Sequence, residues 1–320
     1  MDMKFDQSNE QLIGVLSAAG AYFTWGLLPV YWKLMPNVPA QEVLAHRIVW
    51  SFVFMVFVLF LSRKGKAFWG ECKEIVSQRN KLFGIVLASA LISINWFTYI
   101  WAVSHNHIVQ SSLGYYINPL VSVLLGVIVL KEKLSFWQII SFLLAAVGVL
   151  NMMIHFGAVP WVSLTLAASF GLYGLSKKMV NAGAMTGLTL ETLFVAPFAL
   201  MFIGSVHNGG NGAFGFDKPV IAWLLIGAGA ITAVPLLLFA AGAKRLPLAV
   251  IGFLQYISPT LMLILGVFFY HESFTSVHLI SFVFIWVALT IFSLSRTSLF
   301  THLESQFLKR AQLDTRDKKV

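Results

Sequence analysis

Two stretches of the chain are free of acidic and basic side chains for far longer than a water-soluble domain allows. Residues 82–130 give 49 such positions, and residues 134–176 give 43. A helix that crosses a bilayer needs about 20 mostly apolar residues, so each stretch has room for two crossings. Six further apolar segments bring the expected number of crossings to ten: residues 11–32, 40–62, 188–205, 219–243, 246–271 and 273–295.

The composition also indicates a protein surrounded by lipid. Charged residues make up 11% of the chain and hydrophobic residues 58%, whereas about 25% of the residues in a soluble domain are charged. We therefore predict an all-α integral membrane protein whose first partner is the lipid bilayer. The single cysteine, Cys72, excludes an internal disulfide bond and a cysteine-based metal site, and no metal or cofactor is expected.

The net charge of +9 is best explained by membrane orientation. In a soluble protein it would suggest nucleic acid as a partner, but no folded segment carries a basic face, so we exclude nucleic acid. With the N-terminus in the cytoplasm and alternating crossings, 19 of the 22 Lys and Arg residues lie in cytoplasmic segments, and only Lys33 and Lys218 lie outside. This distribution follows the positive-inside rule and predicts that both termini are cytoplasmic.

The chain matches itself after a shift of about 140 residues. Tyr116 then corresponds to Tyr256, and Glu42 corresponds to Glu191 with a shift of 149. Because five crossings per copy is an odd number, the second copy must enter the membrane from the opposite face. Inverted repeats are common in secondary carriers, although duplication can also do no more than enlarge a bundle. The expected organisation is a cytoplasmic tail at 1–10, five-helix halves at 11–155 and 156–295, and a basic cytoplasmic tail at 296–320.

Arg47 is the most informative single residue. It lies about two turns inside the expected crossing at 40–62, where a charge costs roughly 2.5–3.5 kcal/mol on insertion scales and usually has a function. Two functional roles fit: Arg47 holds an anionic group of a substrate in a central cavity, or it pairs with a carboxylate during a conformational change. Two structural roles also fit, namely reaching the outer lipid headgroups and forming a fixed ion pair.

Three other titratable residues are candidates for coupling to protons. Glu42 and His46 are four residues apart and share a helical face, whereas Arg47 points away from Glu42 and should find a partner on another helix. Glu42 and Glu191 occupy equivalent positions in the two halves, and a carboxyl group in a low dielectric can load and release a proton near neutral pH. The alternative is that both are first-turn carboxylates stabilised by the helix dipole, because both lie near the expected starts of their crossings.

The remaining site candidates are polar and aromatic residues of the expected crossings, which suit a cavity that binds a solute and releases it. They are Tyr22, Trp25, Asn95, Trp96, Tyr99, Trp101, Tyr115, Tyr116, Asn118, Tyr173, Gln255, Tyr256 and Ser258. Asn118 and Gln255 each need a partner, because an unsatisfied amide is costly in lipid. Interfacial belts also contain many Trp and Tyr residues, so only part of this set is expected to line a cavity.

Four motifs together resemble a known family. They are FTWGLLPVYWK at 23–33, EVLAHRIVWS at 42–51, SLGYYINPL at 112–120 and LKEK at 130–133. Over residues 11–295 the chain resembles the RarD branch of the EamA-type transporters, in the drug/metabolite transporter superfamily. The resemblance implies ten transmembrane helices in two EamA repeats within a bacterial inner membrane, and it does not specify a substrate.

We therefore expect a secondary transporter that moves a small metabolite or drug-like solute by alternating access, with protons as a candidate coupling ion. The chain has no G-x-x-x-x-G-K-[ST] phosphate loop, which argues against direct coupling to ATP. A channel and a membrane-embedded enzyme are the alternatives. An enzyme would need a converging set of catalytic groups, which the sequence does not offer, and no residue is assigned a catalytic role.

Overall fold

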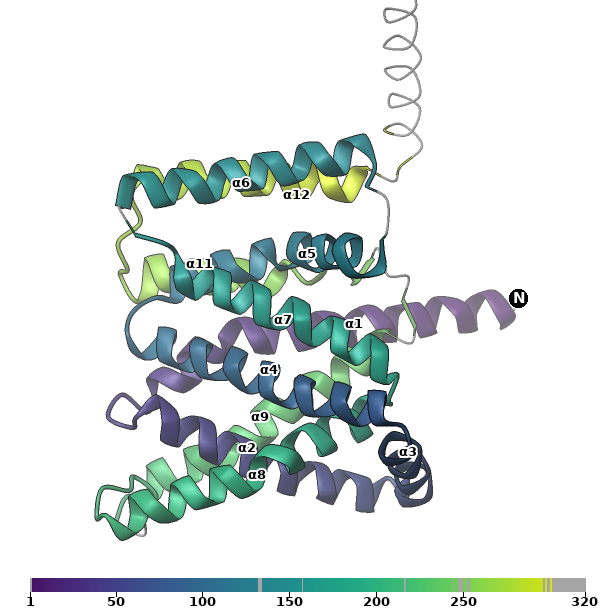
Figure 1. Ribbon diagram of the computed structural model, residues 1–320, viewed down its shortest axis with the longest axis vertical. Helices are drawn as coiled ribbons and strands as arrows, with labels where there is room; N and C mark the ends of the chain where they lie inside the picture. Colours follow the sequence, from purple (N-terminus) through teal and green to yellow (C-terminus); the bar gives the residue numbers. More distant parts are fainter. Residues whose placement is uncertain are drawn as a thin grey trace, which may run out of the picture. The chain divides into compact units, whose positions relative to one another are not determined.

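The computed structural model describes residues 2–131, 134–156, 158–215, 217–243, 245–246, 250–251, 254–295, 297 and 300. Every regular element in these ranges is a helix (Figure 1), which suits a lipid environment because a helix pairs its own backbone polar groups. The helices are α1 (Asp2–Lys33), α2 (Ala40–Leu61), α3 (Gly65–Ser77), α4 (Arg79–Ser104), α5 (Ile108–Leu130), α6 (Phe136–Phe156), α7 (Trp161–Val180), α8 (Ala184–Asn208), α9 (Pro219–Ala243), α11 (Ile257–Ile264), the π-helix η1 (Leu265–Phe269) and α12 (Ser276–Leu294). Most of the tail expected at 296–320 lies outside the described residues.

Seven helices in the described part of the chain are long and apolar enough to cross a membrane. They are α1 from Glu10, α2, α4, α6 as far as His155, α8, α9 and α12, and each coincides with an expected crossing. Two further helices, α5 with 23 residues and α7 with 20, also lie at expected positions but are not among those seven. The sequence of α7 includes Lys177 and Lys178 near its end, which lowers its hydropathy.

The crossing expected at 246–271 is not one continuous helix, which corrects that prediction. Within the described residues Gln255 and Tyr256 form a turn, followed by α11 of 8 residues and η1 of 5. Pro259 explains the interruption, because its ring nitrogen cannot donate a hydrogen bond to the carbonyl of Gln255 four residues earlier. The uninterrupted apolar run therefore contains a backbone break.

The helices form two compact units, and each unit takes helices from both halves of the sequence. Unit 1 comprises residues 1–118 and 162–272, and unit 2 comprises residues 119–161 and 273–320. In unit 1, α2 packs against α8 and α9, and α1 packs against α9 and α11. In unit 2, α6 and α12 run side by side (Figure 1). The chain passes from unit 1 to unit 2 within α5.

Close packing of two helices in unit 1 depends on a small residue. A Cβ atom on Gly229 of α9 would lie 2.3 Å from the backbone of Trp50 in α2, so glycine is required for this approach of two helices.

Large apolar side chains are exposed on the described helices. Phe60 and Trp223 are 80% and 72% exposed. Large apolar side chains in such positions suit a surface that faces lipid.

The short helix α3 is attached to unit 1 by one apolar face and one carboxylate. Cys72 and Ile75 are buried, while Trp69 is 65% exposed. The Glu71 Oε2 atom accepts a hydrogen bond of 3.0 Å from the backbone N–H of Gly183, the residue that precedes α8. The first half of the sequence therefore reaches the start of a helix in the second half.

Glu272 holds the beginning of α5 in unit 1. Its two carboxylate oxygens accept hydrogen bonds from the backbone N–H groups of Ile108 and Val109, at 2.7 and 2.8 Å. A helix leaves the N–H groups of its first turn unpaired, and a carboxylate there also interacts favourably with the helix dipole. The residues joined by the first of these bonds are 164 positions apart, so this cap is a tertiary contact.

Glu272→Ala is expected to lower the stability of the protein by about 1.5–3 kcal/mol, the range for a hydrogen bond to a charged group, because two N–H groups lose their acceptor. The measurement is the apparent Tm of the protein in detergent. Glu74→Ala is the matched control, since the Glu74 side chain is 56% exposed and pairs with Lys81 at the surface, where ion pairs contribute about 0–1 kcal/mol. Equal losses for the two variants would contradict the capping role.

Candidate functional site

Arg47 lies two turns inside α2 and is buried within unit 1. The residue is 3% exposed. Its Nε and Nη1 atoms are buried without a hydrogen-bond acceptor, and no ion pair involves it among the described residues. Arg47 therefore has no ion pair among the described residues and is not exposed, so neither of the two structural roles considered for it fits.

Aromatic rings lie against the Arg47 guanidinium group. Its central carbon is 4.2 Å from the ring centroid of Trp96 and 5.3 Å from that of Trp32, both within range of a cation–π interaction. Tyr99 and Tyr115 are close enough to interact with it electrostatically. We call these five residues the Arg47 cluster. Its members come from α1, α2, α4 and α5, all in unit 1 and all in the first half of the sequence.

The Arg47 cluster contains four buried polar atoms without a hydrogen-bond partner in the described residues. They are Arg47 Nε and Nη1, Trp32 Nε1 and Tyr99 Oη. Tyr115 differs, because its hydroxyl donates a hydrogen bond of 3.3 Å to Asn95 Oδ1. Buried polar groups in proteins are normally paired, so this concentration of unpaired atoms around a charge is typical of a ligand-binding site.

Asn95 anchors the Arg47 cluster to the second half of the sequence. Its Nδ2 atom donates to the carbonyl oxygen of Leu166 and to Ser169 Oγ, each at 3.0 Å, while its Oδ1 atom accepts from Tyr115. The amide is satisfied at both ends, as an apolar environment requires. Asn95 therefore positions Tyr115 and links α4 to α7.

Glu42 and His46 face a different part of unit 1 from Arg47. Glu42 Oε1 accepts a hydrogen bond of 2.7 Å from the backbone N–H of Ala213, and the His46 ring stacks on Phe214 with centroids 4.9 Å apart. This is the shared face that their spacing predicts. Glu42 also lies in the first turn of α2, where the helix dipole stabilises a negative charge.

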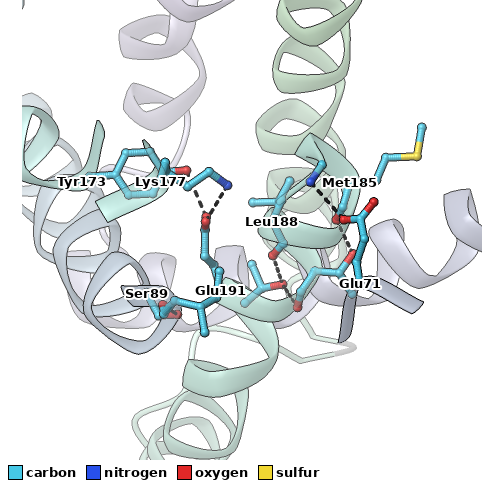
Figure 2. Close-up of polar contacts among 11 residues, drawn as sticks. Glu71, Ser89, Tyr173, Lys177, Met185, Leu188 and Glu191 are labelled. Carbon is cyan, nitrogen blue, oxygen red and sulfur yellow. Dashed lines mark hydrogen bonds and ion pairs between the residues drawn. The ribbon is translucent and has the colours of Figure 1, made fainter. Parts of the chain in front are cut away.

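Glu191 forms a second charged site in unit 1, shown in Figure 2. Its side chain is fully buried, with Oε1 2.7 Å from Lys177 Nζ and Oε2 accepting a hydrogen bond of 3.0 Å from the Tyr173 hydroxyl. Tyr173 and Lys177 both belong to α7 and point toward this carboxylate on α8 (Figure 2). The buried negative charge is therefore paired, and both of its oxygens have a hydrogen-bond donor.

The position of Glu191 corrects the expectation that it lies in the first turn of its helix. α8 begins at Ala184, ahead of the apolar segment, so Glu191 is about two turns inside, beyond the turn where the helix dipole acts. Gly187, one turn earlier, leaves room for its partner, because a Cβ atom there would lie 2.2 Å from Lys177 Nζ. Lys177 therefore replaces the helix dipole as the stabilising charge.

Tyr116 and Tyr256, which correspond to each other in the two halves, are in direct contact. Their rings stack with centroids 6.1 Å apart and 20° between planes. The Tyr116 hydroxyl also forms a hydrogen bond of 2.6 Å with Thr260 Oγ1. Corresponding elements of the two halves, α5 and the segment around α11, therefore meet at this pair.

Three more of the predicted site residues, Trp25, Asn118 and Gln255, have other surroundings. Trp25 packs edge to face on Tyr22, with ring centroids 5.4 Å apart. Asn118 is buried, and its Oδ1 atom has no hydrogen-bond partner within the described ranges. Gln255 occupies the turn that precedes α11.

Two residues of these sites are not predicted from the sequence. Trp32 occurs within a motif but carries no charge or spacing that distinguishes it from an interfacial tryptophan. Lys177 was counted only as a cytoplasmic charge. Its four-residue spacing from Tyr173, which puts both on one helical face, is the signal that points to a shared partner.

An apolar groove between α2, α4 and α8 does not coincide with the charged sites. Leu44, Ile48, Phe97, Val195 and Phe198 are among the residues that line it. None of the lining residues belongs to the Arg47 cluster.

The comparison with known protein families agrees with this arrangement. The sequence model described as "EamA-like transporter family" matches the chain twice, at residues 12–154 and 156–294. The chain belongs to this family. It therefore consists of two EamA segments, and the resemblance inferred from the four sequence motifs is confirmed.

Curated relatives of this EamA protein are named as transporters or as RarD. "Uncharacterized transporter YojE" of Bacillus subtilis (strain 168) is 50% identical over 294 residues, which are 91% of this chain and 96% of that protein. "Protein RarD" of Escherichia coli (strain K12) is 43% identical over 279 residues, which are 87% and 93% of the two chains. The protein is thus a multi-pass membrane transporter of the EamA family, related to bacterial RarD.

One solved crystal structure supports the fold of this EamA protein. It is 15% identical in sequence and superposes with a TM-score of 0.57, covering 91% of this chain and 99% of that chain. At this level of identity the similarity concerns the fold alone.

Arg47→Met is expected to raise the apparent Tm of the ligand-free protein. Desolvating an unpaired ion costs several kcal/mol, which exceeds the roughly 0.5–2 kcal/mol that each cation–π contact returns. Lys33→Met is the control, because Lys33 contacts the Tyr270 ring at 5.1 Å and hydrogen-bonds to Asn106 at an exposed position, so its loss should lower the Tm slightly. A lower Tm for Arg47→Met would indicate that Arg47 serves stability.

Lys177→Met is expected to lower stability by about 3 kcal/mol, because it leaves Glu191 buried without its counter-charge. This value is the lower end of the range for broken buried ion pairs, since Lys177 is 25% exposed. Adding Glu191→Leu to the same protein should restore most of the loss, as the unpaired charge is then gone. Chemical denaturation of the single and double variants measures both effects, and additive losses would contradict the pairing.

Proposed function

We propose that this EamA protein is a secondary transporter that moves a small metabolite or drug-like solute across a bacterial inner membrane by alternating access. The supporting observation is the Arg47 cluster, in which a cation and unpaired donors lie inside an apolar bundle. Arg47 is 3% exposed, so a solute can reach it only if helices move apart. That requirement favours a carrier over a channel that is open at rest.

The proposal includes ten crossings in two inverted halves. Seven of the described helices are long and apolar enough to span a membrane. The other three crossings would be α5, α7 and the α11–η1 segment. Contacts between corresponding helices support a two-fold relation between the halves: α2 packs against α8, each the second crossing of its half, and α6 packs against α12, each the fifth. A pseudo-two-fold axis between repeats generates contacts of this kind.

The proposed orientation has both termini in the cytoplasm. The distribution of Lys and Arg residues supports it, with 19 of 22 on the cytoplasmic side. In this orientation α3 lies at the cytoplasmic surface, where the exposed Trp69 suits the headgroup region. The Lys177–Glu191 pair then lies toward the same side.

Glu191 is the better candidate for proton coupling in this proposal. Lys177 and Tyr173, the two groups that hold its carboxylate, both come from α7, so separation of α7 from α8 would free it. Protonation would in turn release Lys177 and weaken the α7–α8 contact. Glu42 instead accepts a backbone hydrogen bond from the segment between α8 and α9, which suits a structural role.

A transport assay tests the proposed function. Proteoliposomes are incubated with a bacterial metabolite extract, and the solutes that enter are identified by mass spectrometry against empty liposomes. One group of chemically related solutes is expected to enter. Arg47→Gln should reduce their entry by about tenfold to a hundredfold, because a lost hydrogen bond to a charged group is worth about 1.5–3 kcal/mol.

Arg245→Gln is the matched control for the transport assay. Arg245 forms an ion pair with Glu10 at an exposed position, so its loss should leave transport unchanged. If no solute enters through the wild-type protein, the proposed function is wrong. If Arg47→Gln transports as well as the wild type, Arg47 has no part in the mechanism.

A further inference from the structure

We infer that the solute of this transporter is an organic monoanion whose carboxylate binds at Arg47. The inference rests on the proposed function and adds the chemical class of the substrate. It follows from the charge of the Arg47 cluster, from the type of its unpaired atoms and from the rings that surround them.

The charge of the Arg47 cluster selects against cations and neutral solutes. Arg47 is its one charged member, and the residue is 3% exposed. Two acidic side chains are also buried among the described residues: Glu191 pairs with Lys177, whereas Glu42 accepts a hydrogen bond from the backbone N–H of Ala213 on Oε1 and has no partner for Oε2. A cation would be repelled, and a neutral solute would leave the guanidinium without a counter-charge in a low dielectric. A single negative charge neutralises the cluster.

The unpaired atoms of the Arg47 cluster select an acceptor. Arg47 Nε, Arg47 Nη1 and Trp32 Nε1 can only donate hydrogen bonds, and Tyr99 Oη can also donate. A carboxylate accepts several hydrogen bonds through two oxygens and is planar, which matches the geometry of a guanidinium group. A phosphate dianion carries more negative charge than the single cation of the cluster can neutralise.

The rings of the Arg47 cluster indicate what accompanies the carboxylate. Trp96 lies with its ring centroid 4.2 Å from the guanidinium carbon, and Tyr99 and Tyr115 meet edge to face with centroids 5.8 Å apart. Aromatic surfaces of this kind pack well against uncharged, largely apolar groups. The part of the solute that packs on these rings is therefore largely apolar.

Matched carboxylates and amides test this inference in binding experiments that do not depend on transport. The probes are butyrate with butyramide and phenylacetate with phenylacetamide, added to the detergent-solubilised protein, with affinity measured by calorimetry and apparent Tm. At least one carboxylate should bind about tenfold or more tightly than its amide, since its hydrogen bonds to Arg47 are charge-assisted. In Arg47→Gln that preference should disappear.

Trp32→Phe provides a second variant that keeps a ring but removes one donor. It should weaken carboxylate binding several-fold and leave amide binding unchanged, and it keeps the inference falsifiable if Arg47→Gln fails to fold. Equal binding of all carboxylates and their amides by the wild type would overturn the inference, as would an undiminished preference in both variants.

The outcomes separate this inference from the proposed function. Carboxylate-selective binding without entry of any solute into proteoliposomes would support the site and refute transport. Entry of neutral or cationic solutes, together with equal binding of carboxylates and amides, would support transport and refute the anionic substrate.

Discussion

An ionised side chain in a bilayer has no water to stabilise it, and Glu191 and Arg47 of unit 1 meet this constraint in different ways. Glu191 meets it with an ion pair and a hydrogen bond, from Lys177 and Tyr173 on one neighbouring helix. Arg47 meets it with the faces of aromatic rings and leaves hydrogen-bond donors unused. The first arrangement joins two helices, whereas the second leaves a buried charge without a counter-charge among the described residues.

The site nevertheless depends on both halves of the chain. The Arg47 cluster belongs to the first half, but its support comes from the second, because Asn95 is fixed by Leu166 and Ser169 of α7. The same interleaving occurs between α2 and α9, which approach closely at Gly229. A movement of the second-half helices would therefore alter the surroundings of Arg47 directly.

Local patterns in the sequence predicted much of this architecture, and the partners of the charged residues were harder to obtain. Apolar run lengths located most helices, and helical spacing separated the face of Glu42 and His46 from that of Arg47. The length of the apolar run did not reveal the turn at Gln255, because a single proline hardly changes the hydropathy of such a run. The pairing of Glu191 with Lys177 was missed because two helices must pack before those side chains meet, and sequence spacing alone does not determine that packing.

The cap on α5 has a consequence for the order in which the protein matures. α5 is synthesised and inserted well before Glu272 leaves the ribosome, since 164 positions separate Ile108 from that carboxylate. Until the later segment arrives, the first N–H groups of α5 have to be satisfied by water or lipid headgroups. The final placement of this helix is therefore a late step of biogenesis that requires both EamA segments.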